Sequence, residues 1–234
     1  MPGKLYGVSV GPGDPELITI KARKRIEASN TIAYPVRAPG EESTALNIVK
    51  GAVDLSGKRI EEIQFEMNPD PLVRESNYQD AIKKIARLLD EGDVSMINLG
   101  DATVFSTYMH ISLDISKLGY ETETIPGVTS FCSGAAEAGI PLVIDDEGLV
   151  IVPYAKESNQ LFKALRDFDN IVVMKAFNSM KSLEFMMNEF NISKDKAVVL
   201  SNIGMADQYV GDFDTEKKYG YFTTVIIKKK GKGK

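Results

Sequence analysis

Hydrophobic positions along the chain follow two different spacings, and segments with the two spacings alternate. Between Tyr78 and Leu89, apolar residues recur at the i, i+3, i+4 and i+7 positions that place them on one face of a helix. Residues 4–10 and 94–99 are instead short apolar runs with the length of buried strands. Such alternation predicts a mainly parallel sheet that is covered by helices.

The pattern also divides the chain into two halves. For the first half it predicts strands at 4–10, 31–34 and 94–99, and helices at 16–27, 43–50, 78–89 and from near Phe105. For the second half it predicts strands at 121–125, 149–152, 171–174, 197–200 and 221–228, helices at 127–138, 158–167 and 179–188, and a hairpin corner at 207–211. The predicted fold class is α/β, with two α/β domains over residues 1–117 and 118–234.

Cysteine and histidine each occur once, which limits the chemistry available to the chain. Cys132 and His110 cannot form a disulfide or a His/Cys metal site between them, so we expect no metal site. Ser106 and His110 lie one helical turn apart but lack an orienting acid, which makes a hydrolase improbable. Cys132 lies among small residues, and we expect it to be a buried spacer.

Charge disfavours a nucleic-acid partner. The chain has 28 basic and 33 acidic residues, a net charge of −5. Five of the positive charges lie in a glycine-broken tail that we expect to be solvated, at positions 228, 229, 230, 232 and 234. Without that tail the balance is 23 − 33 = −10, which does not suit a polyanion-binding surface. There is no apolar run of membrane-spanning length and no signal-peptide pattern, so we expect a reduced, cytoplasmic location.

Gly11-x-Gly13, after the first predicted strand, is the first candidate for ligand binding. Glu16 stands where a dinucleotide-binding motif would have its third glycine, and no Gly-Lys-Ser/Thr follows, so a phosphate loop is disfavoured. Two interpretations remain open. One is a tight strand-to-helix turn with Pro15 at the first helical position, and the other is a backbone packed closely against a neutral or cationic ligand.

Three further strand ends carry candidate ligand-binding residues. Leu99-Gly100-Asp101 follows a buried strand, where α/β sheets place their ligands, although Asp101 could equally cap the next helix. The hydroxyl groups of 126–130 (Pro-Gly-Val-Thr-Ser) could bind a ligand or cap a helix. Met174 ends another strand, where a core position is the more common role for methionine.

Taken together, these motifs resemble the tetrapyrrole methylase family. The matching segments are, in order, 7–19 (Gly-Val-Ser-Val-Gly-Pro-Gly-Asp-Pro-Glu-Leu-Ile-Thr), 99–101 (Leu-Gly-Asp) and 125–130 (Ile-Pro-Gly-Val-Thr-Ser). The resemblance covers essentially the whole chain. It implies two α/β domains with a cleft between them for the methyl donor S-adenosylmethionine, and a homodimer.

Within that family, the chain is most similar to the C-20 methyltransferases of cobalamin biosynthesis. The distinguishing stretch is 100–107 (Gly-Asp-Ala-Thr-Val-Phe-Ser-Thr), supported by 125–131, 173–175 and 221–227. Pro35 stands where uroporphyrinogen methylases usually have aspartate. The resemblance implies methylation at C-20 of precorrin-2 or of its cobalt-loaded counterpart, cobalt-factor II. The opening Gly-Lys-Leu-Tyr and the strand at Tyr221 favour the cobalt form.

The resemblance also implies site residues. The expected cofactor contacts are Pro12, Leu99, Gly100, Asp101, Val104, Thr129, Ser130, Met174, Met205 and Thr224. Asp101 is in addition the candidate for assisting proton removal, because it lies nearest the expected methyl donor. Arg37 is expected to contact substrate carboxylates, or else to be a solvated loop residue, and Tyr34 and Tyr108 either face the macrocycle or fill the core.

Several alternatives to this function stay open at this point. The chain could be another corrin-ring methylase, a diphthine synthase or a ribosomal RNA ribose methylase, although the acidic body conflicts with the last. It could also be a tetrapyrrole-binding protein that has lost catalysis. An ordinary nucleotide-binding domain is disfavoured because the lysine of a phosphate loop is absent.

Overall fold

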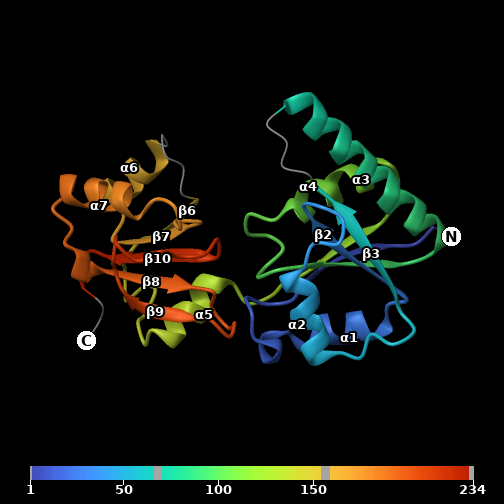
Figure 1. Cartoon of the computed structure of the whole chain (residues 1–234), viewed down its shortest axis with the longest axis horizontal. Coiled ribbons are helices and arrows are strands. Elements are labelled where there is room, and N and C mark those ends of the chain that lie inside the picture. The colour runs from blue at the N-terminus through green and yellow to red at the C-terminus, as the bar shows by residue number, and fades with distance from the viewer. Residues whose placement is uncertain (1, 66–69, 154–158, 232–234) are drawn as a thin grey trace. The chain divides into compact units, whose positions relative to one another are not determined.

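A computed structural model describes residues 2–65, 70–153 and 159–231 of the chain (Figure 1). It divides into two compact units, Met1–Thr129 and Ser130–Lys234. The sequence placed the boundary after residue 117, whereas strand β5 (Thr122–Ile125) pairs with β1 (Leu5–Ser9) and so belongs to the first sheet. Among the described residues, no helix is both long and apolar enough to cross a membrane.

The first unit is built on a five-stranded sheet in the order β3-β2-β4-β1-β5. Its other strands are β2 (Thr31–Val36), β3 (Arg59–Gln64) and β4 (Val94–Asn98). Every pairing is parallel, which confirms the expectation drawn from the alternation of strands and helices. Strand β3 was not predicted, because it is a polar edge strand in which only Ile63 is buried.

Helices cover both faces of this sheet (Figure 1). Helices α1 (Ile20–Ala28) and α2 (Thr44–Ala52) pack on one face, and α3 (Pro71–Glu91) and α4 (Thr107–Lys117) on the other. The single helix predicted at 16–27 is divided into a short 3-10 turn, Pro15–Leu17, and α1. The division occurs because Thr19 is extended and caps α1 with its side chain.

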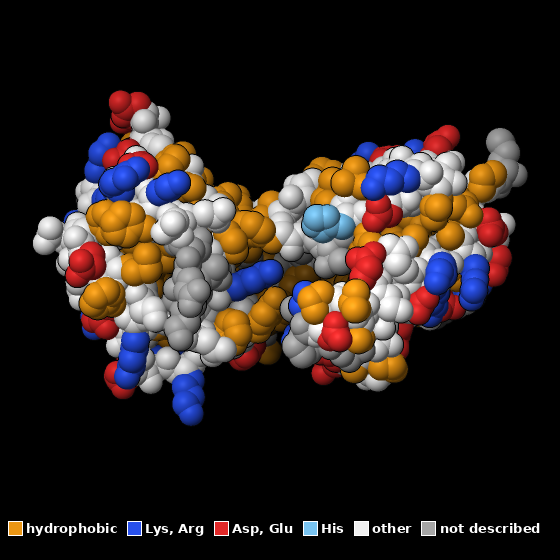
Figure 2. Space-filling model, turned by 90° about the horizontal axis from the view of Figure 1, so that it is seen from above, with side chains coloured by type: hydrophobic (Ala, Val, Ile, Leu, Met, Phe, Trp, Pro, Cys, Tyr) orange, Lys and Arg blue, Asp and Glu red, His pale blue; other side chains and the backbone are white. Residues whose placement is uncertain are grey.

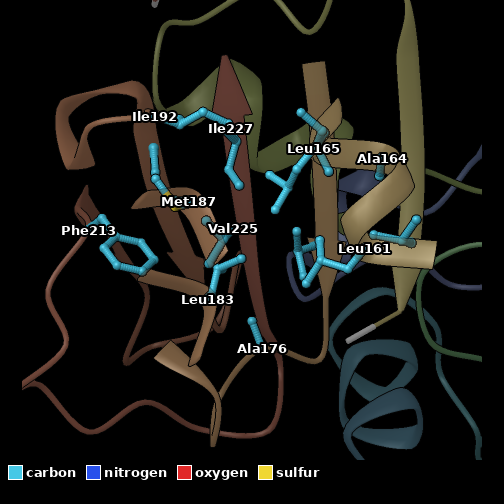
Figure 3. Close-up of a cluster of buried hydrophobic side chains, with 14 of the residues drawn as sticks. Leu161, Ala164, Leu165, Ala176, Leu183, Met187, Ile192, Phe213, Val225 and Ile227 are labelled. Carbon is cyan, nitrogen blue, oxygen red and sulfur yellow. The ribbon is translucent and has the colours of Figure 1, made fainter. Parts of the chain in front are cut away.

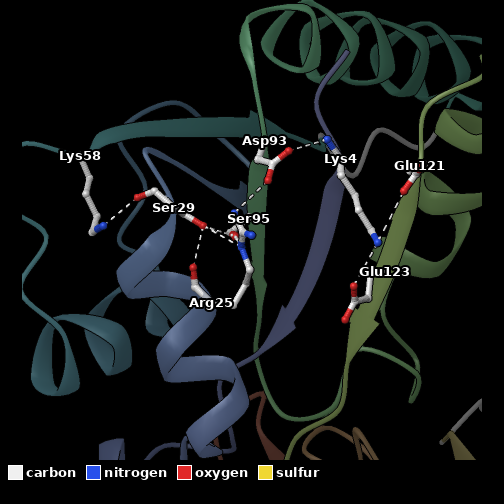
Figure 4. A network of polar contacts seen from close by, with 8 residues as sticks. All are labelled: Lys4, Arg25, Ser29, Lys58, Asp93, Ser95, Glu121 and Glu123. Atoms are coloured by element: carbon white, nitrogen blue, oxygen red, sulfur yellow. Dashed lines mark hydrogen bonds and ion pairs between the residues drawn. The ribbon is translucent and has the colours of Figure 1, made fainter. Parts of the chain in front are cut away.

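The amino-terminal edge of this sheet is held by a polar network (Figure 4). Arg25 on α1 donates a hydrogen bond to Ser95 and pairs with Asp93, 3.3 Å away in each case. The hydroxyl groups of Ser29 and Ser95 are hydrogen bonded to each other. Lys4 pairs with Glu123 across β1 and β5 at 3.1 Å. These contacts fix α1 and the strand starts at the edge opposite the loops that follow β1, β4 and β5.

The second unit contains a mixed sheet in the order β6-β7-β10-β8-β9. Its strands are β6 (Leu149–Pro153), β7 (Asn170–Met174), β8 (Ala197–Ser201), β9 (Tyr209–Asp212) and β10 (Thr223–Lys228). Strands β6 and β7 are parallel, while β10 runs antiparallel to both β7 and β8. The predicted hairpin corner at 207–211 is in part strand β9, which pairs antiparallel with β8.

A hydrophobic core fills the space between this second sheet and helices α6 (Asn159–Asp167) and α7 (Met180–Glu189) (Figure 3). Leu161 on α6 and Leu183 on α7 are fully buried against Val225 on β10. Helix α5 (Ser130–Glu137) lies on the other face of the sheet, and η2 (Lys194–Lys196) precedes β8. Ser158, the predicted start of α6, lies outside the described residues.

Two expectations about single residues are wrong. Cys132 is exposed on α5 and is not a buried spacer, because it faces away from the side of α5 on which Phe131 and Ala135 are buried. Lys228 is not part of a solvated tail. It ends β10 with 1% of its side chain exposed, and its ammonium group donates to Asn170 Oδ1 at 2.8 Å and pairs with Glu147 at 3.5 Å. Lys232 and Lys234 lie outside the described residues.

Candidate functional site

Three loops that carry the sequence motifs meet at the carboxyl edge of the first sheet. They follow β1, β4 and β5, which are neighbours because β1 lies between the other two strands. The chain leaves β1 toward α1 on one face of the sheet and leaves β4 toward α4 on the opposite face. Loops that diverge in this way form the switch-point crevice where open α/β sheets bind ligands.

Gly11 and Gly100 join the first two loops through their backbones. Gly100 N donates to Gly11 O at 2.7 Å, and Gly11 N donates to Gly100 O at 3.2 Å. Both residues adopt a left-handed conformation, with φ of 78° and 69°, which favours glycine. A Cβ built on Gly100 would meet no atom of the described residues within 4 Å. The Gly100 backbone is therefore open to a ligand.

Asp101 ties the second loop to the third. Its Oδ1 accepts from the backbone N and the hydroxyl of Thr103, and its Oδ2 accepts from Gly127 N at 2.7 Å. Burial disfavours the charged carboxylate, but the hydrogen bonds from Thr103 and Gly127 outweigh it, so the pKa of Asp101 is lowered. A carboxylate with a lowered pKa and three donors around it is a weak base, which does not suit the expected role in proton removal.

Ser9 and Gly127 complete the junction. Both lie within the sequence motifs, but neither was among the expected site residues. Ser9 ends β1 with its side chain fully buried, and its hydroxyl accepts from Ala102 N at 2.8 Å. A Cβ on Gly127 would lie 2.5 Å from Ser9 Cβ and 2.7 Å from Gly100 O, so only glycine fits without displacement. The available signal was a small polar residue at the end of an otherwise apolar strand.

The loop after β1 is a tight turn with Pro15 at its first helical position, which is one of the two interpretations that the sequence left open. Asp14 accepts from Glu16 N at 2.8 Å, and Pro15 occupies the first position of the 3-10 turn. Pro12, an expected cofactor contact, is buried in this loop, and Leu99 in the second loop is half-buried. The two acidic residues of the turn leave no suitable place for a phosphate.

Helix α4 is capped by Ser106 and not by Asp101. The Ser106 hydroxyl accepts from Tyr108 N and donates to the buried Asn98 Oδ1, both at 3.2 Å. Because these contacts engage the Ser106 hydroxyl, it is not available to His110, which is exposed. Val104, an expected cofactor contact, is half-buried and donates its backbone N–H to Asp101 O at 3.1 Å.

The three expected substrate residues have different environments. Tyr108 is fully buried, and its hydroxyl donates to Glu123 O at 3.0 Å, so it fills the core. Tyr34 is 8% exposed and donates to Glu62 Oε1 at 3.0 Å. Arg37 is exposed in the loop after β2, and its guanidinium lies 3.6 Å from Glu41. Of the three, Arg37 is the one that lies outside the core.

In the second unit, two of the expected cofactor residues lie where β7 ends and β10 begins. Met174 and Thr224 are partners in the β7–β10 ladder, and Met205 N donates to Asn202 O in the loop after β8. Thr224 also pairs with Leu200, against which Gly134 of α5 packs. Ser130 is the first residue of α5, and Thr129, the last residue of the first unit, precedes it.

Acidic and basic side chains are interspersed on the face shown in Figure 2. The described residues contain no group of three or more His, Cys, Asp or Glu side chains that could hold a metal ion. The junction of the three loops offers the open Gly100 backbone beside the buried Asp101 carboxylate, which suits a neutral or cationic organic ligand better than a phosphate.

Comparison with known proteins identifies the family. The model of the Tetrapyrrole (Corrin/Porphyrin) Methylases matches residues 4–217. The chain belongs to this family. The match spans all three loops of the crevice and the end of β7, so the family expected from the motifs is confirmed.

Individual relatives cover the chain almost completely. A probable cobalt-precorrin-2 C(20)-methyltransferase of Methanocaldococcus jannaschii is 32% identical over 228 residues, 97% of this chain and 96% of the relative. The cobalt-precorrin-2 C(20)-methyltransferase of Salmonella typhimurium is 27% identical over 98% of both chains. Among solved structures, the uroporphyrin-III C-methyl transferase from Thermus thermophilus complexed with S-adenyl homocysteine has a TM-score of 0.72 at 17% identity over 97% of each chain. This last likeness confirms the tetrapyrrole methylase fold with its two α/β domains.

Proposed function

We propose that this tetrapyrrole methylase is an S-adenosylmethionine-dependent C-methyltransferase that acts at C-20 of cobalt-factor II in corrin-ring biosynthesis. The observation that carries the proposal is the near-complete alignment with two relatives named for C-20 methylation of cobalt-precorrin-2. The stretch 100–107, which resembles the C-20 methyltransferases, supports it, because it contains Asp101, whose carboxylate bonds to the loop after β5.

The crevice in the first unit suits S-adenosylmethionine. The Gly100 backbone is open, the Asp101 carboxylate adds negative potential, and the donor carries a positive sulfonium. When bound, the donor supplies a methyl group that is already activated. We assign its binding to Pro12, Leu99, Gly100, Asp101 and Val104 in the first unit. We add Thr129 and Ser130 at the start of α5, Met174 and Thr224 in the β7–β10 ladder, and Met205 in the loop after β8.

Asp101 is proposed to act as a positioning residue. Its hydrogen bonds to Thr103 and Gly127 hold two loops of the crevice in one arrangement, and orientation of the reacting atoms is the main task when the methyl group is already activated. The nucleophile is the meso carbon between rings A and D, which the macrocycle nitrogens make enamine-like. A carbon–carbon bond forms at this carbon as the carbon–sulfur bond breaks, and the meso proton is then lost.

The substrate carries acetate and propionate carboxylates, which need cationic partners on an acidic protein. Arg37 is proposed as one such partner, because it is exposed in the loop after β2. Tyr34 is a weaker candidate, since its hydroxyl is already bonded to Glu62. We further propose that the enzyme is cytoplasmic and forms a homodimer, as the family resemblance implies.

An anaerobic methyl-transfer assay tests the proposal. Cobalt-factor II and metal-free precorrin-2 are offered separately with S-adenosylmethionine, and the products are read by mass. We expect the mass of one methyl group to be added to the cobalt substrate. Turnover of the metal-free substrate alone would show that the enzyme methylates precorrin-2 and not its cobalt-loaded counterpart. Transfer to neither, with S-adenosylhomocysteine still bound, would contradict the proposed substrate.

A further inference from the structure

A cluster of aromatic side chains lies at one end of the second sheet. Phe177 follows β7, and Tyr221 and Phe222 precede β10. The rings of Phe177 and Tyr221 are 5.4 Å apart, and those of Tyr221 and Phe222 are 5.3 Å apart, both in edge-to-face geometry. Tyr221 is 42% exposed and Phe222 is 38% exposed. Aromatic rings that remain this exposed while they pack on each other present an apolar surface to a ligand.

Lys175, two residues before Phe177, has an unusual backbone conformation. It is exposed, and its φ of 61° lies in the left-handed region, which a long side chain rarely adopts. The chain on both sides is fixed, because Met174 pairs with Thr224 and Ala176 N donates to Thr223 O at 3.0 Å. Strain that the surrounding structure maintains in this way is common at binding sites.

The ammonium group of Lys175 has no carboxylate, hydrogen-bond acceptor or ring as a partner among the described residues. Several other lysines of the same unit are engaged: Lys181 with Glu216, Lys194 with Glu184, and Lys217 with Tyr209. A cation without a partner in the described part of the chain, carried on the strand end that also bears exposed aromatic rings, is suited to a flat ring system that carries a carboxylate. The rings supply contact area, and the ammonium group supplies charge neutralisation.

We propose that Lys175, Phe177, Tyr221 and Phe222 form a binding site for a carboxylate-bearing edge of the tetrapyrrole, with Lys175 paired to a peripheral carboxylate. The inference rests on the proposed function, and it adds a substrate contact in the second unit that the sequence did not suggest. Met174 and Thr224, at the same sheet end, are among the residues proposed for the methyl donor, so the two proposed sets of contacts adjoin there.

Equilibrium binding of uroporphyrin III tests this site without requiring turnover, because that porphyrin is flat and carries eight carboxylates. Binding to the full chain is followed by fluorescence. We expect Lys175→Met to weaken binding about tenfold, since it keeps the strained backbone and removes only the charge. Lys175→Arg should retain most of the affinity. The control Lys163→Met, at an exposed position on α6, should leave binding unchanged.

Three further readouts separate this site from a structural role and from the proposed function. S-adenosylhomocysteine affinity and the urea midpoint should be the same for Lys175→Met and the unaltered chain. In the methyl-transfer assay, Lys175→Met should raise the KM for the tetrapyrrole and leave kcat nearly unchanged. Equal porphyrin binding by Lys175→Met, or an equal loss in Lys163→Met, would overturn the site even if methyl transfer occurs. Porphyrin binding that depends on Lys175, without methyl transfer, would support the site and contradict the proposed function.

Discussion

Asp101 is the residue through which the loops after β4 and β5 are held together. Asp101→Asn would place an amide N–H₂ against Thr103 or Gly127, each of which also presents a donor. We expect this substitution to lower the free energy of unfolding by about 1–3 kcal/mol, because a buried donor is left unpaired. Affinity for S-adenosylhomocysteine should fall at least about tenfold, as measured by calorimetry.

Asp54→Asn provides a matched control for this variant. Asp54 also accepts from the backbone N–H two residues later, Ser56, at 2.9 Å, but it is exposed and has no hydrogen bond to a second loop of the described chain. Its substitution should leave cofactor affinity unchanged. If Asp101→Asn binds S-adenosylhomocysteine as tightly as Asp54→Asn, Asp101 does not position the crevice.

The lowered pKa of Asp101 predicts a pH dependence. The folded-state pKa lies below the ordinary value of 3.8, so the unfolded chain takes up the proton first as the pH falls. The stability that Asp101 contributes is therefore complete above pH 3.8 and is lost as the pH falls through the folded-state value. Urea unfolding should show a difference between the unaltered chain and Asp101→Asn near neutral pH that shrinks at acid pH. If the difference in unfolding free energy between the two proteins did not change with pH, the ionised Asp101 carboxylate would not be its cause.

A substitution at Tyr108 tests whether this residue fills the core or contacts the substrate. Tyr108→Phe removes the hydrogen bond to Glu123 O and leaves the ring, which packs under Gly7 so closely that a Cβ there would lie 2.1 Å from it. We expect a loss of about 1 kcal/mol in the free energy of unfolding, measured in urea, and no change in the KM for the tetrapyrrole. A several-fold rise in KM without a loss of stability would show that the hydroxyl reaches the substrate.

Among the elements, strand β10 ends in a buried ion pair, and burial changes how much such a pair contributes to the free energy of unfolding. Lys228→Ala leaves Glu147, only 10% exposed, and Asn170 without their cationic partner. We expect a loss of about 3 kcal/mol in the free energy of unfolding. The control Lys230→Ala breaks an exposed pair with Asp169 and should cost less than about 1 kcal/mol. Equal effects in urea unfolding would mean that Lys228 belongs to a solvated tail after all.

Elements with a strong apolar pattern could be predicted from the sequence, and those without one could not. Helix α3 and strands β1 and β4 bury continuous or periodic apolar faces, so their positions followed from spacing alone. Strand β3 lies at the sheet edge and buries only Ile63, so no pattern marked it. The ammonium group of Lys228 is buried by partners more than 50 residues away in sequence, which local spacing cannot indicate.

At the scale of the whole molecule, the motifs indicated which loops form the candidate site but not how they interlock. The rule that ligands bind at the carboxyl ends of parallel strands was enough to select residues 11–13, 99–101 and 126–130. It could not show that Asp101 would bond to Gly127, or that Ser9 would bond to Ala102, because those contacts depend on β1 lying between β4 and β5. Strand order is a property of the assembled sheet.

If this tetrapyrrole methylase places one methyl group on C-20, the new carbon must be found at that position of the product. The enzyme is incubated anaerobically with cobalt-factor II and S-adenosylmethionine labelled with carbon-13 in the methyl group. The product is then examined by nuclear magnetic resonance after removal of the metal. We expect a single labelled methyl group on the meso carbon between rings A and D. A label on any other carbon of the macrocycle would contradict it.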